Sequence, residues 1–202
     1  MDDVRERLAS YEPKLLSARD KRHAAVAMVL RELGDGLDIL FIERAEREGD
    51  PWSGHMAFPG GRLEDIDHGP RAAAERETHE EVGVSLRDAS YLGRLDDLEG
   101  RHAGRPSGLV ISAHVYQLDE VAPVQPNYEV REAFWFPLAG LRDPVRRVDY
   151  RHPVLPDQRF PGILVGEPER HVVWGLTYRF LEVFFEVVGK PLPERWELPS
   201  GG

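Results

Sequence analysis

Cysteine is absent from the 202 residues of this chain, which excludes disulfide bonds and thiolate metal sites. Apolar runs are short, and none approaches the roughly 20 consecutive apolar residues of a membrane-spanning helix. Met1–Val4 carries no basic segment that leads into an apolar core, so we expect no signal peptide and a cytoplasmic protein. No low-complexity linker is visible either, and we therefore expect a single domain over residues 1–202.

Positive charge is scarce relative to negative charge. The chain has 26 Lys and Arg against 36 Asp and Glu, and its formal net charge is −10. Nucleic acids and anionic membrane surfaces attract basic faces, so we expect neither as a partner. A polyanionic substrate can enter an acidic protein only where bound cations and local arginines reverse the sign of the potential. Phosphate chemistry in this chain is therefore expected to depend strictly on a metal ion.

A dense acidic block is the most informative feature that is present. A proline and a glycine at suitable ends predict a helix over about residues 70 to 82. Residues three and four apart share a helix face, which brings Glu77, Glu80 and Glu81 together. Such a cluster is either an ordinary solvated face or a site where a hard divalent cation is shared between carboxylates and phosphates.

The residues around the acidic block favour the second reading. Phe58-Pro59-Gly60-Gly61 is typical of a strand end that turns sharply, and paired glycines let backbone groups approach a ligand closely. Arg76 stands four residues before Glu80, at a spacing that allows an ion pair on the helix. The sequence thus predicts a metal-dependent phosphate site between the glycine pair and the helix.

The stretch from Arg76 to Val84, Arg-Glu-Thr-His-Glu-Glu-Val-Gly-Val, resembles the second half of the Nudix box of the Nudix hydrolases. In the first half, Gly61 and Arg76 are one residue farther apart than in the general box, and Asp67 takes the first Glu position. This insertion with Asp resembles the coenzyme A pyrophosphatase branch of the family. The resemblance implies an α/β fold, an α/β/α sandwich over a mixed sheet.

Residues upstream of the box match that branch only in part. Arg44 and Gly54 fall in the register of the branch, but Asp50 stands where the branch carries a second Arg. An acid near a phosphate-rich substrate argues against coenzyme A itself. The markers of the ADP-ribose and dinucleoside polyphosphate branches would fall at about Glu99 to His102 and are missing there.

The activity implied by the resemblance is a divalent-metal-dependent pyrophosphatase that uses Mg²⁺ or Mn²⁺ and hydrolyses a nucleoside diphosphate linked to another moiety. The best single choice of substrate is coenzyme A or acyl-CoA, cleaved to 3′,5′-ADP and (acyl-)phosphopantetheine. The alternatives are ADP-ribose or a nucleotide sugar, and a Nudix module that senses a nucleotide without hydrolysing it. The complete acidic set argues against the sensor. The implied partner is a small nucleotide-derived molecule, and the fold is compatible with a homodimer.

The resemblance also implies roles for individual residues. The expected metal ligands are Glu77, Glu80, Glu81 and the carbonyl of Gly61 or Gly60. The expected general base is one of Glu77, Glu80 and Glu129, with Glu132 an alternative to Glu129. Arg76 is expected to orient the carboxylates rather than to touch the substrate. The candidate substrate-binding residues are Arg44, His55, Arg62, Arg101 and Arg105.

Periodicity predicts the remaining elements. The expected strands cover residues 23–30 and 37–42, joined as a hairpin, and residues 91–95, 109–116 and 133–137. The expected helices cover residues 3–18, interrupted near Pro13, and residues 171–188, the second of them buried. Residues 96–108 are expected to form a long polar loop, which either contacts the substrate or only connects two strands.

Overall fold

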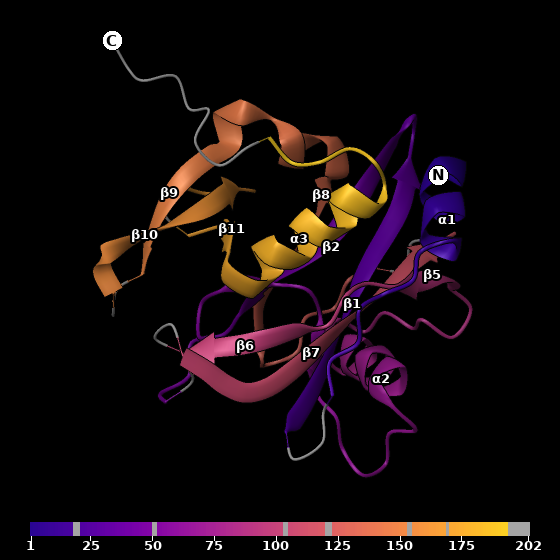
Figure 1. The fold of residues 1–202 in the computed structure, drawn as a ribbon, viewed down its shortest axis with the longest axis horizontal. Helices are drawn as coiled ribbons and strands as arrows, with labels where there is room; N and C mark the ends of the chain where they lie inside the picture. The colour runs from indigo at the N-terminus through magenta and orange to yellow at the C-terminus, as the bar shows by residue number, and fades with distance from the viewer. Residues whose placement is uncertain are drawn as a thin grey trace.

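The fold combines a large mixed sheet with a smaller antiparallel sheet, as a computed structural model of the chain shows (Figure 1). The structure describes residues 1–17, 21–49, 52–102, 105–119, 123–152, 155–168 and 170–193. The large sheet contains β1 (Arg22–Leu33), β2 (Gly36–Arg44), β3 (Met56–Ala57), β4 (Gly60–Arg62), β5 (Ser90–Arg94), β6 (Leu98–His102), β7 (Arg105–Leu118) and β8 (Val130–Pro137). The smaller sheet contains β9 (Arg147–His152), β10 (Leu155–Leu164) and β11 (Val172–Trp174). The helices are α1 (Asp2–Ala9), α2 (Pro70–Val82) and α3 (Gly175–Val187), with 3₁₀ turns η1 (Leu138–Arg142) and η2 (Pro144–Arg146).

The large sheet is mixed because β1 runs parallel to β7 and antiparallel to β2 and β4. On the outer side of β2, β8 and β3 pair antiparallel with it, and β5 and β6 pair antiparallel with β7. The predicted hairpin is confirmed: Leu33 pairs with Gly36 across a turn in which Gly34 has a φ of 57°. Glycine favours this left-handed conformation because it has no Cβ.

Side chains alternate along β1 and so supply two cores, one on each face of the sheet. Val29 belongs to the same buried cluster as Ala73 of α2, whereas Leu30 belongs to the cluster that contains Phe184 of α3. Figure 1 shows α2 and α3 on opposite sides of the sheet. The predicted α/β/α sandwich is therefore confirmed.

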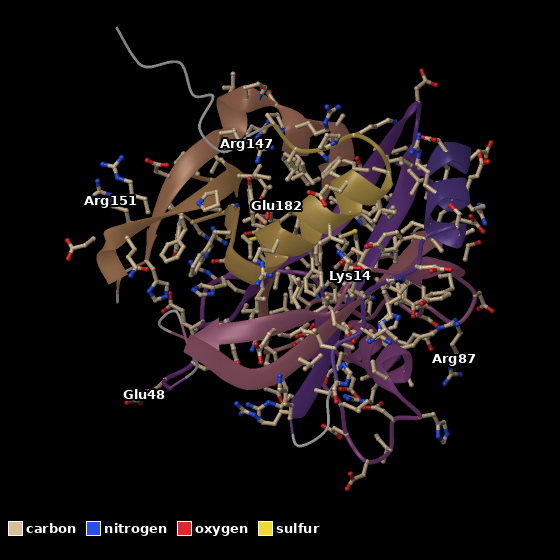
Figure 2. All side chains as sticks on the ribbon, viewed as in Figure 1. Lys14, Glu48, Arg87, Arg147, Arg151 and Glu182 are labelled. Atoms are coloured by element: carbon tan, nitrogen blue, oxygen red, sulfur yellow. The ribbon has the colours of Figure 1, made fainter. Side chains whose placement is uncertain are left out.

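Side chains fill the layer between the large sheet and α3, while charged side chains such as Glu48, Arg87 and Arg151 extend outward (Figure 2). Within the described parts of the chain, every helix is too short or too polar to cross a bilayer. The predicted helix over residues 70–82 is confirmed as α2. It ends where Gly83, at a φ of 70°, donates its N–H to the carbonyl of His79 at 2.9 Å.

The N-terminal helix is shorter than predicted. It ends at Ala9 rather than near residue 18, and the Ser10 hydroxyl donates to the carbonyls of Glu6 and Arg7. Pro13 also opposes continuation, because a residue before proline avoids the helical region. An interruption was expected near Pro13, but the helix ends four residues before it.

Two further predictions were wrong because strand pairing between distant segments overrode local pattern. Residues 171–174 were expected to be helical, but β11 pairs with β10 and α3 begins only at Gly175, whose φ is 62°. Residues 96–108 were expected to be a loop, but β6 pairs with β7, with Leu98 opposite Ile111. Sheet partners of this kind are not visible in a local window.

His114 on β7 is a buried polar group that predicts acid sensitivity. It is 3% exposed, and its Nδ1 lies 3.1 Å from the Tyr91 hydroxyl. Burial, together with the charges of Arg94 and Arg71, lowers the pKa of His114 from 6.5 to about 4. In the unfolded chain this histidine is protonated below about pH 6.5, whereas in the folded protein it is protonated only below about pH 4. The unfolding free energy therefore falls as the pH drops through this window.

We expect this histidine to cost about 2 kcal/mol of unfolding free energy between pH 7 and pH 5. The measurement is urea unfolding at both pH values for the wild type and for His114→Gln. The decrease in unfolding free energy from pH 7 to pH 5 should be about 2 kcal/mol smaller in His114→Gln than in the wild type. The matched control is His68→Gln at an exposed position. Equal losses in the wild type and in His114→Gln would refute the prediction.

Candidate functional site

The glycine pair brings strand β4 into direct contact with helix α2. A Cβ at Gly61 would lie 2.3 Å from an Oε atom of Glu77, so a side chain there would enter the space of this carboxylate. Gly60, at a φ of 155°, lies against β1, where a Cβ would come within 2.3 Å of the Ala25 carbonyl oxygen. Its N–H donates to Glu81 Oε2 at 2.8 Å. The glycine pair thus allows β4 to lie close to α2 and β1, and its approach to a ligand stays a prediction.

Glu81 is the buried member of the acidic cluster, and Glu77 beside it is partly buried. Glu81 is 2% exposed, and Arg44 Nη1 lies 3.9 Å from its Oε1. Burial raises the pKa of Glu81 to about 8; Gly60 and Arg44 oppose this shift, and Glu77 and Glu129 add to it. Burial also raises the pKa of Glu77, against the effect of Arg76. A carboxylate whose pKa is raised by burial has too little positive charge around it to favour its ionised form. A divalent cation would supply that charge.

Arg76 connects the loop before α2 to the carboxylates of the helix. It donates to both oxygens of Asp67 at 3.0 Å, to Glu77 Oε1 at 3.0 Å and to Glu80 Oε2 at 3.1 Å. Its remaining contact is with the carbonyl of Arg62 at 3.1 Å. These contacts are compatible with the expected role of orienting the carboxylates, which stays a prediction. Asp67, at the first acidic position of the box, is a partner of Arg76, which holds the pKa of Asp67 below its usual range.

Glu129 reaches the same region from the loop before β8. The N–H of Asn127 donates to the carbonyl of Glu81 at 2.8 Å, which fixes this loop to the end of α2. Arg47 Nη2 lies 2.8 Å from Glu129 Oε1. Sequence reasoning missed this partner of Glu129, since no spacing relates two loops so far apart. Glu132, the alternative to Glu129, contacts Arg170 instead and lies apart from the cluster.

The predicted substrate-binding residues do not lie together in the structure as far as it describes them. Arg44 lies beside Glu81, while His55 packs edge-on against Trp174 with ring centroids 4.8 Å apart. Arg62 is exposed. The side chains of Arg101 and Arg105, and the whole of Asp50, lie outside the part of the chain that the structure describes.

A second polar cluster lies on the other face of β2, because adjacent strand residues point to opposite faces. Glu43, Glu132 and His171 place ligand atoms within 4.8 Å of one another, a group that could hold a metal ion. However, Arg170 Nη2 donates to Glu43 at 2.6 Å and its Nε donates at 3.0 and 3.1 Å. Burial raises the pKa of Glu43, but Arg170 and Arg131 outweigh burial and hold it below its usual range.

The hydrogen bond of His171 also opposes a metal ion in the second cluster. The N–H of Glu167 donates to His171 Nδ1 at 3.0 Å, so Nδ1 carries the lone pair and the hydrogen of the neutral ring is on Nε2. Nε2 is the atom that faces Glu43, at 3.5 Å, and it therefore offers a donor rather than a metal ligand. We interpret this cluster as an ion-pair network.

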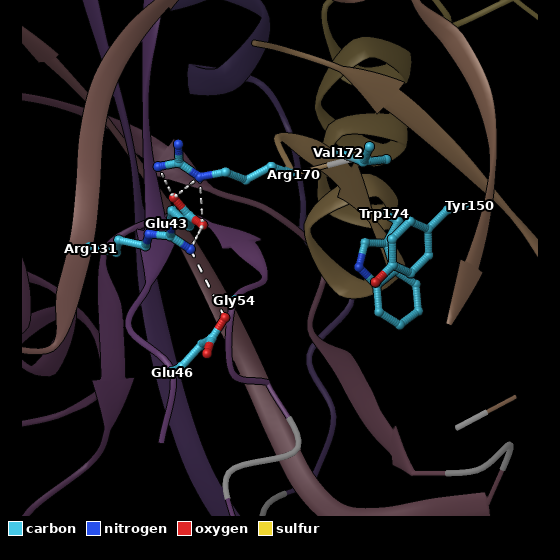
Figure 3. A pocket seen from close by; sticks show the side chains of 8 residues that line it. All are labelled: Glu43, Glu46, Gly54, Arg131, Tyr150, Arg170, Val172 and Trp174. Carbon is cyan, nitrogen blue, oxygen red and sulfur yellow. Dashed lines mark hydrogen bonds and ion pairs between the residues drawn. The ribbon is translucent and has the colours of Figure 1, made fainter. Parts of the chain in front are cut away.

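A cavity of about 240 Å³ opens beside this network (Figure 3). The lining residues are Glu43, Glu46, Gly54, Arg131, Tyr150, Arg170, Val172 and Trp174. The sequence did not indicate it, because its walls come from β2, β8, β9 and β11 and meet only in the folded chain.

The fold is a mixed sheet between helices, and it holds a glutamate-bearing helix against a glycine pair. This arrangement defines the class of protein, and the comparisons agree. The sequence model of the NUDIX domain matches residues 21–158, so the chain belongs to the NUDIX domain family. Nudix hydrolases generally use divalent metal ions. A MutT/nudix family protein from Enterococcus faecalis has a similar fold, with a TM-score of 0.55 at 20% identity over 90% of this chain and 66% of that one.

Curated relatives include Nudix hydrolases. The uncharacterized Nudix hydrolase NudL of Enterobacter sp. (strain 638) is 28% identical over 95% of this chain and 96% of its own length. Two Schizosaccharomyces pombe proteins are also similar: the uncharacterized protein C14C4.10c, at 32% identity over 66% of this chain, and the probable nudix hydrolase C6G9.05, at 27% over 83%. The chain spans about half the length of these two, 47% and 56% respectively. The coenzyme A branch stays a prediction.

Proposed function

We propose that this chain is a divalent-metal-dependent Nudix pyrophosphatase that hydrolyses a nucleoside diphosphate linked to another moiety. The single observation that carries the proposal is the burial of Glu81 next to Glu77, with a pKa of Glu81 raised to about 8. A fold that needed only stability would gain by replacing this buried carboxylate with an apolar side chain. Its presence beneath the glycine pair fits a site that holds a cation.

The residues that would hold the metal are Glu77, Glu80 and Glu81, with the carbonyl of Gly61. When bound, Mg²⁺ or Mn²⁺ supplies charge neutralisation on phosphoryl oxygens and lowers the pKa of water. The donor set fits these ions, because hard divalent cations prefer oxygen ligands and share them with substrate phosphates. Glu80, whose side chain is 51% exposed, would lie at the rim, and the buried Glu81 at the base.

The remaining chemistry belongs to the chain. Arg76 keeps the carboxylates oriented, and Arg44, beside Glu81, offers positive charge to a phosphate. A water molecule forms a bond to one phosphorus, the bridging P–O bond breaks, and its electron pair leaves with the departing phosphate. Glu129 accepts the proton of the water in our preferred version, with Glu77 and Glu80 as alternatives.

For the second moiety we propose coenzyme A or acyl-CoA as the first substrate to test, cleaved to 3′,5′-ADP and (acyl-)phosphopantetheine. Support comes from the spacing of the box and from Asp67 within it. Since Asp67 contacts Arg76, it belongs to the scaffold of the site and does not itself read the substrate. A cytoplasmic location is part of the same proposal.

The deciding experiment incubates the purified chain, with Mg²⁺ or Mn²⁺, with coenzyme A, ADP-ribose, NADH and nucleotide sugars. Products are identified by mass spectrometry, and EDTA serves as the metal-free control. We expect cleavage of a diphosphate bond in at least one compound, with no product in EDTA. A folded protein that binds these compounds and releases no product from any of them would favour the sensor module over the enzyme.

A further inference from the structure

The cavity beside β2 has one aromatic wall. Trp174 stacks on Tyr150 with ring centroids 4.4 Å apart and an interplanar angle of 23°. His55 and Phe160 pack around the same indole, with centroids at 4.8 and 5.3 Å. Both Trp174 and Tyr150 are partly exposed and line the cavity, as Figure 3 shows. Such a wall favours a flat ligand that can contact aromatic rings.

The opposite wall carries charge, and its less exposed positive group, Arg170, is already paired. Arg170 uses all three of its nitrogens on carboxylates: Nε and Nη2 contact Glu43, Nη2 also contacts Glu132, and Nη1 contacts Glu167 at 2.9 Å. Arg131 Nη1 lies 3.3 Å from Glu43. A phosphate would have to displace these carboxylates before it could bind the Arg170 guanidinium, whereas the Arg131 side chain is half exposed.

The sum of charge also opposes an anion. This network contains four carboxylates and two guanidinium groups, so two negative charges are in excess. The carboxylates are those of Glu43, Glu46, Glu132 and Glu167, and the guanidinium groups are those of Arg131 and Arg170. Glu46 is the most available of the carboxylates, since its side chain is 80% exposed and its contact with Arg131 is long, at 4.0 Å. It can therefore accept a hydrogen bond from a ligand.

We propose that this cavity binds an uncharged nitrogen heterocycle that carries an exocyclic amino group, of the adenine type, and that it rejects a phosphorylated group. The amino group donates to Glu46 while the ring contacts Trp174. The proposal rests on the proposed function, in that this base is the nucleoside end of the substrate. Glu43 and Arg44 are consecutive residues of β2, so the cavity and the acidic cluster lie on the two sides of one strand end. If coenzyme A is the substrate, its 3′-phosphate lies outside this cavity.

The test uses adenosine, which has no phosphate, and therefore separates the cavity from the acidic cluster. Isothermal titration calorimetry in EDTA measures binding of adenosine and inosine to the wild type and to Glu81→Gln. We expect both proteins to bind adenosine equally and inosine about tenfold more weakly, because the inosine oxo group is an acceptor that faces Glu46. Equal binding of the two nucleosides, or no binding of adenosine, would overturn the proposal.

Variants locate the bound base. Trp174→Ala should weaken adenosine binding by about tenfold, and Trp174→Phe should keep most of it, as expected for aromatic contact with a base. Glu46→Gln, at an exposed position, should remove most of the preference for adenosine over inosine. Tyr128→Ala is the matched control, because Tyr128 is an aromatic residue that is 81% exposed and lies outside the cavity.

Three results would contradict the assignment of the site: loss of binding in Tyr128→Ala rather than in Trp174→Ala, unchanged binding in Trp174→Ala, and tighter binding of adenosine 3′-monophosphate than of adenosine. Failure of the enzyme proposal looks different, since turnover would then be missing in the wild type while adenosine still binds.

Discussion

Glu81→Gln should give a folded protein that has lost turnover by about 100-fold or more at every metal concentration. The expected size follows because even residues that only support metal ligands cost about 10–100-fold when they are replaced. Glutamine retains an oxygen that can accept the N–H of Gly60, which Glu81 binds at 2.8 Å. What it removes is the negative charge that a metal ion requires, so excess metal cannot restore the rate.

The matched control is Glu75→Gln on the same helix. Glu75 contacts Arg71 and Tyr116, outside the acidic cluster, and its replacement should leave turnover within about twofold of the wild type. Circular dichroism and thermal unfolding verify that both variants fold. We also expect Glu81→Gln to be at least as stable as the wild type without metal, because it no longer buries an ionisable group. Wild-type turnover in folded Glu81→Gln would remove the basis of the site.

The helix that carries the acidic residues is the part of the molecule that the sequence predicted well, and the reason is local. Helix α2 has its bounds because proline and glycine act at its two ends, and periodicity alone places Glu77, Glu80 and Glu81 near one another. The glycine pair could also be interpreted from the sequence, since residues without side chains allow a close approach and this pair precedes the helix at a fixed distance. The fold class was implied by the resemblance of this segment to the Nudix box.

Predictions failed where contacts join distant parts of the chain. The strand β11 was missed because Val172 and Val173 suit either a buried helix or a strand, and the choice is made by pairing with Leu164 and Ile163. The Arg47–Glu129 ion pair and the cavity at Trp174 depend on the same kind of long-range contact. Sequence patterns report the period of one segment and carry no information on its neighbour in space.

Gly61→Ala should reduce turnover by about 100-fold while the protein stays folded. The added methyl group would lie 2.3 Å from a Glu77 carboxylate oxygen, so this carboxylate must move, and a displacement of about 1 Å in a catalytic group costs on the order of 100-fold. Stability should change little because the carboxylate is the end of a flexible side chain. Metal affinity, measured by Mn²⁺ titration, should fall together with turnover.

Two other glycines provide the controls that make this result interpretable. Gly60→Ala meets backbone atoms, the Ala25 carbonyl oxygen at 2.3 Å and Val26 Cα at 2.6 Å, and should unfold the protein. Gly36→Ala meets only the Leu33 carbonyl oxygen at 3.7 Å, an ordinary contact, and should retain both fold and turnover. If Gly61→Ala kept wild-type turnover and Mn²⁺ affinity, Glu77 would not be a metal ligand. If it unfolded like Gly60→Ala, the glycine would serve the packing of β4 on α2 rather than the geometry of the metal site.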